Sequence, residues 1–404
     1  MQARKKPVIL LVAEAATLAH FARIMALVRL LDPDIYEIVV ASDPRYMNLE
    51  VPLACQFQPI WSIPSYDFAQ ALAQGKLLYK TETLTRYVED DLKLIDRVKP
   101  DLIVGDFRLS LAVSAPLSGV PYAAVVNAYW SPYADIVYPF PDLPMTRFLG
   151  DRLAQKLFNA ARPIAFALHA RPLNQVRRRY RLPALGYDLR TAYTWGNYTL
   201  YADVPELVPM RPLPANHRHI GPPLWSANAP LPDWWERLPK DKPVVLLTLG
   251  SSGRADLLPM ALSAMDKLPI TVIAATAGKI DLQEVPTNAF VADYLPLNVA
   301  VQRSQLVICN GGSLTTYQAL DLGVPALGLC SNMDQLLNMS AIERLGAGLS
   351  LRAARVRPDQ LKEAARNLLE TPAYTEAARL AGERVRHADA GQRFKEFVAE
   401  ILGD

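Results

Sequence analysis

Short runs of apolar residues, rich in Val, Ile and Leu, alternate with helical stretches along the first half of the chain. The runs predict strands at Pro7–Ala13, Tyr36–Ala41, Leu102–Gly105, Ala123–Asn127 and Thr199–Ala202. Helices are expected near 18–31, 68–98 and 107–118. Strands that are apolar at nearly every residue are typical of a parallel sheet with both faces covered. The pattern therefore predicts a doubly wound α/β domain.

The same pattern restarts after the proline-rich segment Gly221–Asp241, which carries five prolines and no sustained periodicity. Further strands are predicted at Val244–Leu249, Thr271–Ala275, Phe290–Asp293, Leu306–Cys309 and Ala326–Leu329. We therefore expect two Rossmann-like domains that face a central cleft, over 1–222 and 242–385, joined by a linker at 223–241. A helical insertion at about 142–197 interrupts the rhythm of the first domain.

Charge and cysteine content exclude several classes of protein. The 43 Lys and Arg residues nearly balance 40 Asp and Glu residues, for a net charge of +3, which argues against a nucleic-acid binder. Three cysteines without a CxxC motif favour neither a disulfide framework nor a zinc site, and they fit a reducing, cytoplasmic location. The longest uncharged stretch, Leu109–Ala134, is broken by prolines and glycine, so no transmembrane helix is predicted.

The strongest chemical signal lies in Leu306–Asn338, where a strand is followed by two glycines and a helix start rich in hydroxyls. Gly311 and Gly312 allow the backbone to approach a ligand closely. The free N–H groups at the start of the helix favour a phosphate. After the next strand, Asp334 and Gln335 offer an acceptor and an amide suited to sugar hydroxyls.

This segment resembles the donor-binding signature of nucleotide-sugar glycosyltransferases of the GT-B fold, in the UDP-glucuronosyltransferase-like superfamily. Tyr294–Leu297 stands where that family has Trp-x-Pro-Gln, and Leu249–Ser252 is similar to its Phe-Gly-Ser turn. The resemblance implies that the donor is bound by Gly250, Ser251, Ser252, Tyr294, Leu295, Asn310, Gly311, Gly312, Ser313, Leu314, Thr315, Gln318, Asp334 and Gln335. It also implies that a C-terminal helix at 386–404 packs back on the N-terminal domain.

The resemblance implies a catalytic pair in the first domain. His20 corresponds to the histidine that deprotonates an acceptor hydroxyl, and Asp106 to the aspartate that orients it. Both residues follow predicted strands, where ligands of such folds bind. From the residues alone, His20 could equally be a helix-cap or surface histidine, and Asp106 could cap the helix that follows it.

Three positions depart from the family pattern. Asn310 replaces the phosphate-binding histidine and offers only a neutral hydrogen bond. Gln318 replaces an acidic residue that holds the ribose in many members, and Leu297 replaces the usual glutamine. The choice between uridine and thymidine diphosphate therefore stays open.

The insertion carries a local basic surface, because Arg152–Arg181 contains eight Lys and Arg residues and no acidic residue. One interpretation is a solvated helix whose long side chains cover apolar surface. The other is contact with an anionic acceptor or with the inner face of a membrane, through apolar partners such as Leu157, Ile164 and Leu168.

Together these features predict an inverting, metal-independent glycosyltransferase that moves a sugar from UDP or dTDP to a hydroxyl of a small-molecule or lipid-like acceptor. The nucleotide sugar is a substrate, and no cofactor, metal or nucleic acid is expected. No Asp-x-Asp is present in the donor domain to hold a metal, so the start of the helix would meet the leaving-group charge. A sugar-nucleotide epimerase or hydrolase, and a catalytically silent nucleotide-sugar binder, are the alternatives.

Overall fold

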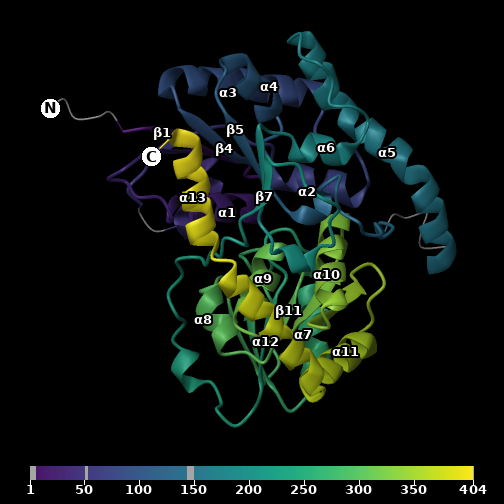
Figure 1. Ribbon diagram of the computed structural model, residues 1–404. Coiled ribbons are helices and arrows are strands. Elements are labelled where there is room, and N and C mark those ends of the chain that lie inside the picture. The colour runs from purple at the N-terminus through teal and green to yellow at the C-terminus, as the bar shows by residue number, and fades with distance from the viewer. Residues whose placement is uncertain (1–5, 51–52, 143–149, 404) are drawn as a thin grey trace. The chain divides into compact units, whose positions relative to one another are not determined.

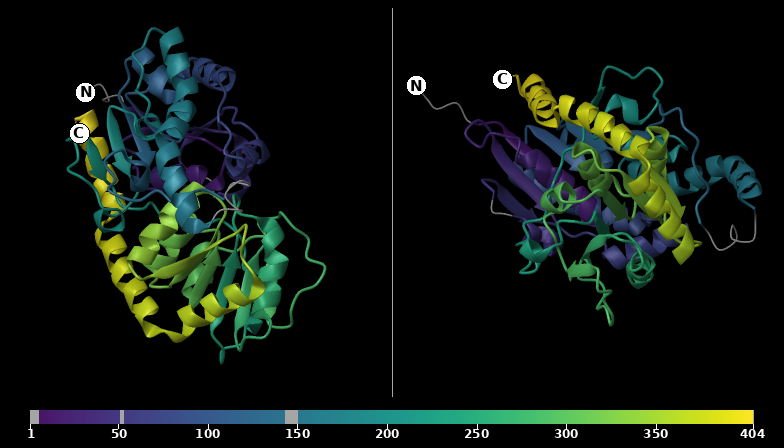
Figure 2. Two further views of the ribbon diagram at one scale, coloured as in Figure 1. Left: turned by 90° about the vertical axis from the view of Figure 1, so that its right-hand side faces the viewer. Right: turned by 90° about the horizontal axis from the view of Figure 1, so that it is seen from below.

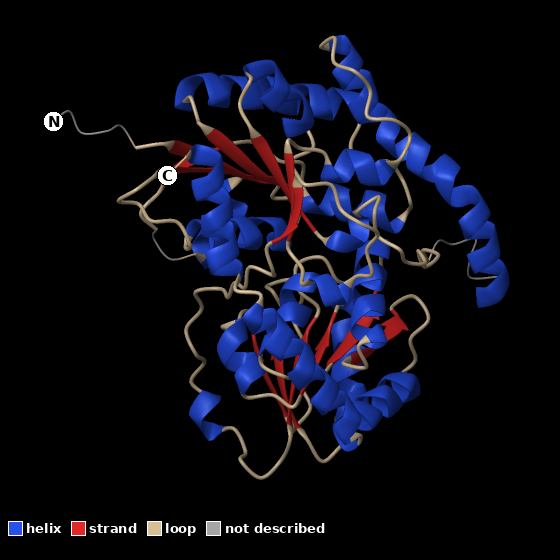
Figure 3. Ribbon diagram, in the orientation of Figure 1, coloured by secondary structure: helices blue, strands red, loops and turns tan. Residues whose placement is uncertain are grey.

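The computed structural model describes residues 6–50, 53–142 and 150–403. It divides into two compact units. Unit 1 consists of Met1–Phe140, Phe148–Pro223 and Ala388–Asp404, and unit 2 of Pro141–Arg147 and Leu224–His387. In each unit helices cover both faces of one sheet (Figure 3). The two predicted parallel-sheet α/β domains are therefore confirmed.

Unit 1 is built on a seven-stranded parallel sheet in the order β3-β2-β1-β4-β5-β6-β7. Its strands are β1 Val8–Ala13, β2 Glu37–Ser42, β3 Gln56–Pro59, β4 Leu102–Asp106, β5 Tyr122–Val126, β6 Tyr198–Tyr201 and β7 His217–His219. The central strands β1, β4 and β5 are buried along their whole length. Their unbroken apolar sequences follow from this burial on both faces.

Within the described residues, α-helices flank this sheet (Figure 1). They are α1 Leu18–Val28, α2 Ser65–Ala73, α3 Thr81–Val98, α4 Leu111–Ser118, α5 Asp151–Arg179, α6 Leu189–Thr194 and α13 Ala390–Leu402. The helix expected at 68–98 is two helices, because the chain turns at Gly75 with a left-handed φ of 63°. The helix expected from residue 107 begins only at Leu111. Part of the expected insertion, 143–149, lies outside the described residues.

Unit 2 has a six-stranded parallel sheet in the order β10-β9-β8-β11-β12-β13. Its strands are β8 Val244–Thr248, β9 Thr271–Ala275, β10 Ala289–Ala292, β11 Leu306–Cys309, β12 Ala326–Cys330 and β13 Gly348–Arg352. Its helices are α7 Leu258–Met265, α8 Leu297–Gln302, α9 Ser313–Asp321, α10 Met333–Arg344, α11 Pro358–Glu370 and α12 Pro372–His387. Short 3₁₀ helices occur in both units. They lie at Pro44–Leu49, Ala128–Trp130 and Pro205–Leu207 in unit 1, and at Trp235–Arg237 and Ala255–Leu257 in unit 2.

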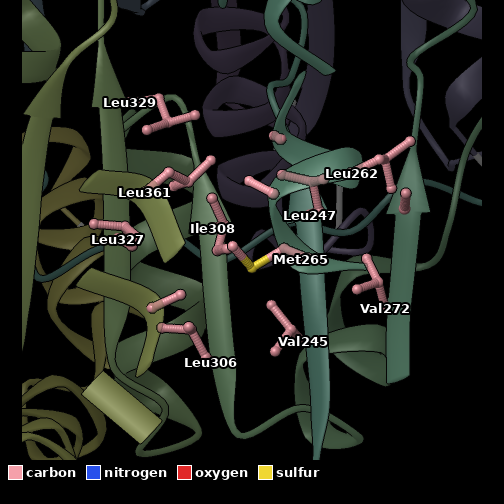
Figure 4. Packing of buried hydrophobic residues seen from close by; sticks show 14 of the residues in the cluster. Val245, Leu247, Leu262, Met265, Val272, Leu306, Ile308, Leu327, Leu329 and Leu361 are labelled. Atoms are coloured by element: carbon pink, nitrogen blue, oxygen red, sulfur yellow. The ribbon is translucent and has the colours of Figure 1, made fainter. Parts of the chain in front are cut away.

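The core of unit 2 shows why its strands read as apolar runs. Val245, Leu247 and Ile308 on neighbouring strands are fully buried and pack with Met265 of α7 and Leu361 of α11 (Figure 4). A second cluster on the other face contains residues from the same strands, such as Leu246 and Val307. Adjacent residues of one strand thus enter different cores, so no polar alternation can appear.

Three edge strands, β3, β7 and β13, were not expected from the sequence. Apart from the buried Gly348, their residues are half-buried or exposed, and their sequences QFQP, HRH and GLSLR contain no apolar run. An edge strand has one side open to solvent and needs less apolar surface. Hydrophobic patterning therefore finds central strands and misses these.

The last two helices of the chain, α12 and α13, belong to different units. Helix α12 packs on α9 in unit 2, whereas α13 belongs to unit 1 (Figure 2). Within unit 1 the ring of Phe397 meets Tyr198 edge-on at 5.4 Å, and Arg218 forms an ion pair with Glu400. Residues of the expected linker also pack, since Trp234 donates Nε1–H to the Val291 carbonyl at 3.1 Å in unit 2.

No helix within the described part of the chain is both long enough and apolar enough to span a bilayer.

Candidate active site

Parallel pairing brings His20 and Asp106 together in unit 1. In the register of β1 and β4, Ala13 lies beside Asp106, and α1 begins five residues after Ala13. As a result, Nδ1 of His20 lies 2.8 Å from Oδ1 of Asp106, and the side chains are 17% and 1% exposed. An ionised carboxylate can only accept a hydrogen bond, so Nδ1 carries the proton. Nε2 of His20 is left to act as a base.

Arg23, which the sequence interpretation did not single out, completes this group. Its guanidinium grips Asp106 at both oxygens, with Nε–Oδ2 at 2.5 Å and Nη2–Oδ1 at 3.0 Å. Burial raises the pKa of Asp106, but the charge of Arg23 and the hydrogen bonds from His20 and Arg23 outweigh it and hold that pKa below its usual range. Asp106 is therefore ionised at neutral pH.

An aromatic wall lies beside the His20–Asp106 pair. Phe107 has a left-handed φ of 56°, and its ring stacks on His20 with centroids 4.8 Å apart and planes within 5°. Tyr193, Phe68 and Tyr79 surround Phe107 at 5.0 to 6.2 Å. The hydroxyl of Tyr79 has no hydrogen-bond partner among the described residues. Phe68, Tyr79 and Tyr193 are themselves buried, so this aromatic cluster packs Phe107 against His20.

A cavity of about 1100 Å³ lies in the same unit, between α2, the start of α3 and the second half of α5. Its walls include apolar residues such as Trp61, Leu78 and Leu168, and cationic residues such as Lys80 and Arg171. This volume is sufficient for a ligand larger than a sugar.

The predicted donor residues of unit 2 meet where β8 and β11 end, because Cys309 pairs with Thr248 in the sheet. Asn310 joins the two segments, since its Nδ2 donates to Ser252 Oγ at 3.0 Å and its Oδ1 accepts from Gly312 N at 3.1 Å. We call residues 250–252, 310–315 and 335 the donor cluster. Asn310, where the family has histidine, thus ties this cluster together.

Gly311 has a backbone geometry that requires glycine. Its φ is +81°, and an added Cβ would lie 2.8 Å from Cys330 Sγ and 2.8 Å from Met339 Cγ. Its carbonyl accepts a bond from Asn338 Nδ2 at 2.8 Å. Only glycine combines this φ with this lack of space.

Helix α9 begins within the donor cluster. Ser313, Leu314 and Thr315 form its first turn and are partly exposed. The first N–H groups of a helix have no partner within the helix, so this turn can donate to an anion.

Gln335 presents a donor beside this turn. Its Oε1 accepts from Ser331 N at 2.8 Å and from Ser331 Oγ at 3.0 Å, while its buried Nε2 has no partner among the described residues. Neighbouring Asp334 is half-buried. Buried amides are seldom left unpaired in this way, so Nε2 fits a ligand oxygen.

The remaining predicted donor residues lie deeper or to one side. Tyr294 donates its hydroxyl to the Ala277 carbonyl at 3.1 Å, and Leu295 is buried in a core cluster. Gln318 is also buried, and its Oε1 has no hydrogen-bond partner in the described part of the chain. Lys279, which sequence reasoning missed, donates from Nζ to the carbonyl of Ser251. The structure therefore adds a cation beside the Ser251 turn.

No group of three His, Cys, Asp or Glu side chains that could hold a metal occurs within residues 6–50, 53–142 and 150–403. The cysteines are free thiols, with Cys309 and Cys330 buried.

Family and sequence comparisons bear on the same regions. The model of the erythromycin biosynthesis protein CIII-like C-terminal domain matches residues 257–395. The PGL/p-HBAD biosynthesis glycosyltransferase of Mycobacterium tuberculosis is 52% identical over 375 residues, which cover 93% of this chain and 88% of the relative. The PGL/p-HBAD biosynthesis rhamnosyltransferase of Mycobacterium bovis is 52% identical over 370 residues, with coverage of 92% and 82%. A protein of Mycobacterium bovis named an inactive PGL/p-HBAD biosynthesis glycosyltransferase is 51% identical over 259 residues, with coverage of 64% and 71%.

Solved structures share the fold over nearly the whole chain. The spinosyn forosaminyltransferase SpnP superposes with a TM-score of 0.72 at 19% identity, covering 99% of this chain and all of that one. The spinosyn rhamnosyltransferase SpnG, complexed with thymidine diphosphate, gives 0.65 at 18% identity, with coverage of 94% and 96%.

The fold and the sequence identities define an enzyme of the GT-B glycosyltransferase class, as the resemblance implied. Within that class, the chain belongs to the family of the PGL/p-HBAD biosynthesis glycosyltransferases.

Proposed function

We propose that this glycosyltransferase moves a deoxyhexose from a nucleoside diphosphate to a hydroxyl of an apolar acceptor, with inversion and without a metal. The observation that carries the proposal is the His20–Asp106 contact of 2.8 Å, with Nε2 of His20 left as the base. The donor cluster of unit 2 supports it, because its backbone and amide donors suit a diphosphate.

In the proposed reaction, the acceptor oxygen attacks the anomeric carbon as the bond from that carbon to the diphosphate oxygen breaks. The acceptor proton passes to Nε2 of His20, and the nucleoside diphosphate leaves with the bonding electron pair. Asp106 stabilises the imidazolium that forms. One displacement on the face opposite the leaving group inverts the anomeric carbon.

A dTDP-linked sugar fits the donor side best. One curated relative is named a rhamnosyltransferase, and a solved structure with the same fold holds thymidine diphosphate. Gln318 is neutral and buried, so it offers no carboxylate to a ribose hydroxyl. We therefore propose dTDP over UDP, with rhamnose as the first sugar to test.

The acceptor is proposed to be aromatic or lipid-like. The cavity beside α5 has room for such a ligand, and its walls include the ring of Trp61 and apolar residues such as Leu78 and Leu168.

The direct test is a product assay with dTDP-rhamnose and UDP-glucose, each with and without a mixture of phenolic and lipid alcohols. We expect free dTDP and a glycosylated alcohol only when donor and acceptor are both present. Release or rearrangement of the sugar without acceptor would favour the epimerase or hydrolase. Nucleotide binding without turnover under every condition would favour a silent binder.

A Gly311→Ala variant serves as the donor-side control. We expect it to weaken dTDP binding by at least about 10-fold in calorimetry, because the added Cβ has no space and displaces the donor cluster. Gly346→Ala is the matched change, since Gly346 also has a left-handed φ of 72° but meets only Ala377 at 3.6 Å. Equal dTDP affinity in both variants would show that the donor cluster does not bind the nucleotide, and that part of the proposal would fail.

We further propose that α5 binds an anionic membrane surface, which would place the enzyme at the inner face of a bilayer. Its exposed side carries four large apolar residues, each at least half exposed: Leu153, Leu157, Ile164 and Leu168. Their spacing of four, seven and four residues keeps them on one face of the helix. Exposed cations lie along the same helix, at Arg152, Lys156, Arg171, Arg178 and Arg179.

Arg177, however, is not part of that surface, which corrects the expectation that the whole basic run is exposed. It is 3% exposed. Its guanidinium donates to the carbonyls of Pro183, at 2.7 Å, and Ala112, and it lies over the ring of Trp195. Arg177 therefore holds α5 to the core of unit 1.

Changing Arg171, Arg178 and Arg179 together to Gln is expected to weaken binding to phosphatidylserine vesicles by about 10²-fold, at about 1 kcal/mol per surface cation. Vesicle co-sedimentation at low and high salt measures this. Lys240, Lys242 and Lys267 are exposed lysines of unit 2, and their triple change to Gln is the matched control. Equal vesicle binding by the two triple variants would contradict the proposal and favour the interpretation of α5 as a solvated helix.

A further inference from the structure

The guanidinium of Arg23 lies between the catalytic carboxylate and the rest of the buried polar interior of unit 1. Arg23 stands one turn after His20 on α1 and is 8% exposed. Beyond its two bonds to Asp106, its Nη1 donates to Asn127 Oδ1 at 2.6 Å. Its Nη2 lies 3.4 Å from Nδ1 of His20. Each guanidinium nitrogen of Arg23 thus lies near a polar atom of Asp106, Asn127 or His20. These four residues form one polar network.

That network continues to the ends of two more strands. Asn127 follows β5, and its Nδ2 donates to Oδ1 of Asp203, which follows β6, at 3.1 Å. The other oxygen of Asp203 accepts from the backbone N–H of Ala128 at 2.5 Å. Arg23 is therefore fixed from both sides and cannot turn away from Asp106 without breaking buried hydrogen bonds.

We propose that Arg23 is a positioning residue, which locks the orientation of Asp106 so that Oδ1 holds Nδ1 of His20 and leaves Nε2 to accept a proton. The inference rests on the proposed role of His20 as the base. A forked guanidinium–carboxylate contact fixes the plane of the carboxylate, so Oδ1 points at Nδ1 of His20. Lysine, a single point charge, cannot fix that plane equally well.

The groups that face His20 carry charges of both signs. Asp106 on β4 and Glu14 after β1 are acidic, while Arg23 on α1 is cationic. An ionised carboxylate beside an imidazole favours the protonated ring, and a cation at 3.4 Å opposes it. Around Arg23 itself, Asp203 adds negative charge on the far side. Removing Arg23 would leave Asp106 to attract a proton onto His20.

The test is an NMR titration of His20 in ¹⁵N-histidine-labelled full-length protein, with the His20→Gln variant used for assignment. In Arg23→Met we expect the titration midpoint of His20 to rise by about one pH unit or more. In Arg23→Lys, which keeps the charge, we expect a shift of less than half of that. The acid limb of kcat/KM should move with the titration midpoint in each variant.

Arg190→Met is the matched control, because Arg190 forms a similar fork with Asp188 in the same unit at 2.7 to 3.1 Å and does not contact His20. We expect no shift of the His20 midpoint in this variant. If Arg23→Met fails to fold, Arg23→Gln removes the charge and keeps an amide donor, with the same expected direction.

An unchanged or lower midpoint in a folded, charge-removed variant would overturn the proposal. The titration needs no turnover, so its outcome is separate from that of the proposed function. If His20→Gln retained full activity, the base role would fail, and the titration would still report whether Arg23 controls the charge of His20.

Discussion

Replacing His20 with Ala is expected to lower kcat by about 10²-fold or more, the usual scale for a lost general base. Without the imidazole, no side chain bonded to Asp106 can accept the acceptor proton, because Arg23 stays protonated. The proposed donor contacts lie in unit 2, so the KM for the nucleotide sugar should stay within about twofold. Initial rates at saturating donor and acceptor measure both quantities.

His387→Ala is the matched control for this variant. His387 lies on α12 of unit 2, is exposed, and hydrogen-bonds through Nδ1 to the Glu383 carbonyl at 2.6 Å. Its replacement should leave kcat unchanged. Near-normal turnover by His20→Ala would show that another group takes the acceptor proton, and the proposed mechanism would then fail.

Most of the strands that could be predicted have both faces covered, although the half-buried edge strand β10 was also predicted. Val8–Ala13 of β1 is buried at every residue, so its sequence contains nothing polar, and patterning locates it to within one residue. Gln56–Pro59 of β3 and His217–His219 of β7 are half-buried or exposed. Backbone hydrogen bonds to a neighbouring strand stabilise them, and these bonds do not require an apolar sequence that a pattern search could detect.

The proposed catalytic pair, His20 and Asp106, could be inferred from the resemblance, but the contact of Arg23 with Asp106 could not. His20 and Asp106 match family positions, whereas no motif in the sequence marks Arg23. The spacing of His20 and Arg23 places them on the same side of a helix. That spacing becomes informative only once β4 is known to carry a carboxylate beside them.

The basic residues of α5 also show that the sequence alone does not reveal which charged side chains are buried. Arg177, Arg178 and Arg179 are consecutive, and each step along a helix turns the side chain by about 100°. One of the three therefore points into unit 1 while the other two are exposed. Charge counting treats the three alike, although only the contacts of Arg177 with Ala112 and Pro183 reveal its structural role.

Arg108→Leu is expected to destabilise unit 1 by about 3–5 kcal/mol, the usual cost of breaking a buried ion pair from one side. Arg108 is fully buried between Asp91 and Glu14, at 3.0 Å and 3.4 Å. It also donates to the Trp61 carbonyl at 2.9 Å and lies over the ring of Tyr87. Its removal would leave two buried carboxylates without a cation. Hydrogen exchange of the β1 and β4 amides measures the loss in unit 1 alone.

The loss should grow as the pH rises. Burial already raises the pKa of Glu14 and of Asp91 above the usual range, against the opposing charge of Arg108. Without Arg108, both values rise further, and the folded state then favours the protonated carboxyls. A carboxyl with a raised folded pKa contributes stability below its unfolded pKa and loses that contribution as the pH increases. We therefore expect a smaller deficit near pH 5 than near pH 7.5.

Two further variants separate a charge effect from a packing effect. Adding Glu14→Gln and Asp91→Asn to Arg108→Leu should recover part of the stability, because the uncompensated charges are removed. Arg254→Leu breaks an ion pair in which both side chains are more than 40% exposed, so we expect a change within about 1 kcal/mol. A deficit in Arg108→Leu that is independent of pH and unrelieved by the neutral pair would assign the loss to packing against Tyr87 instead.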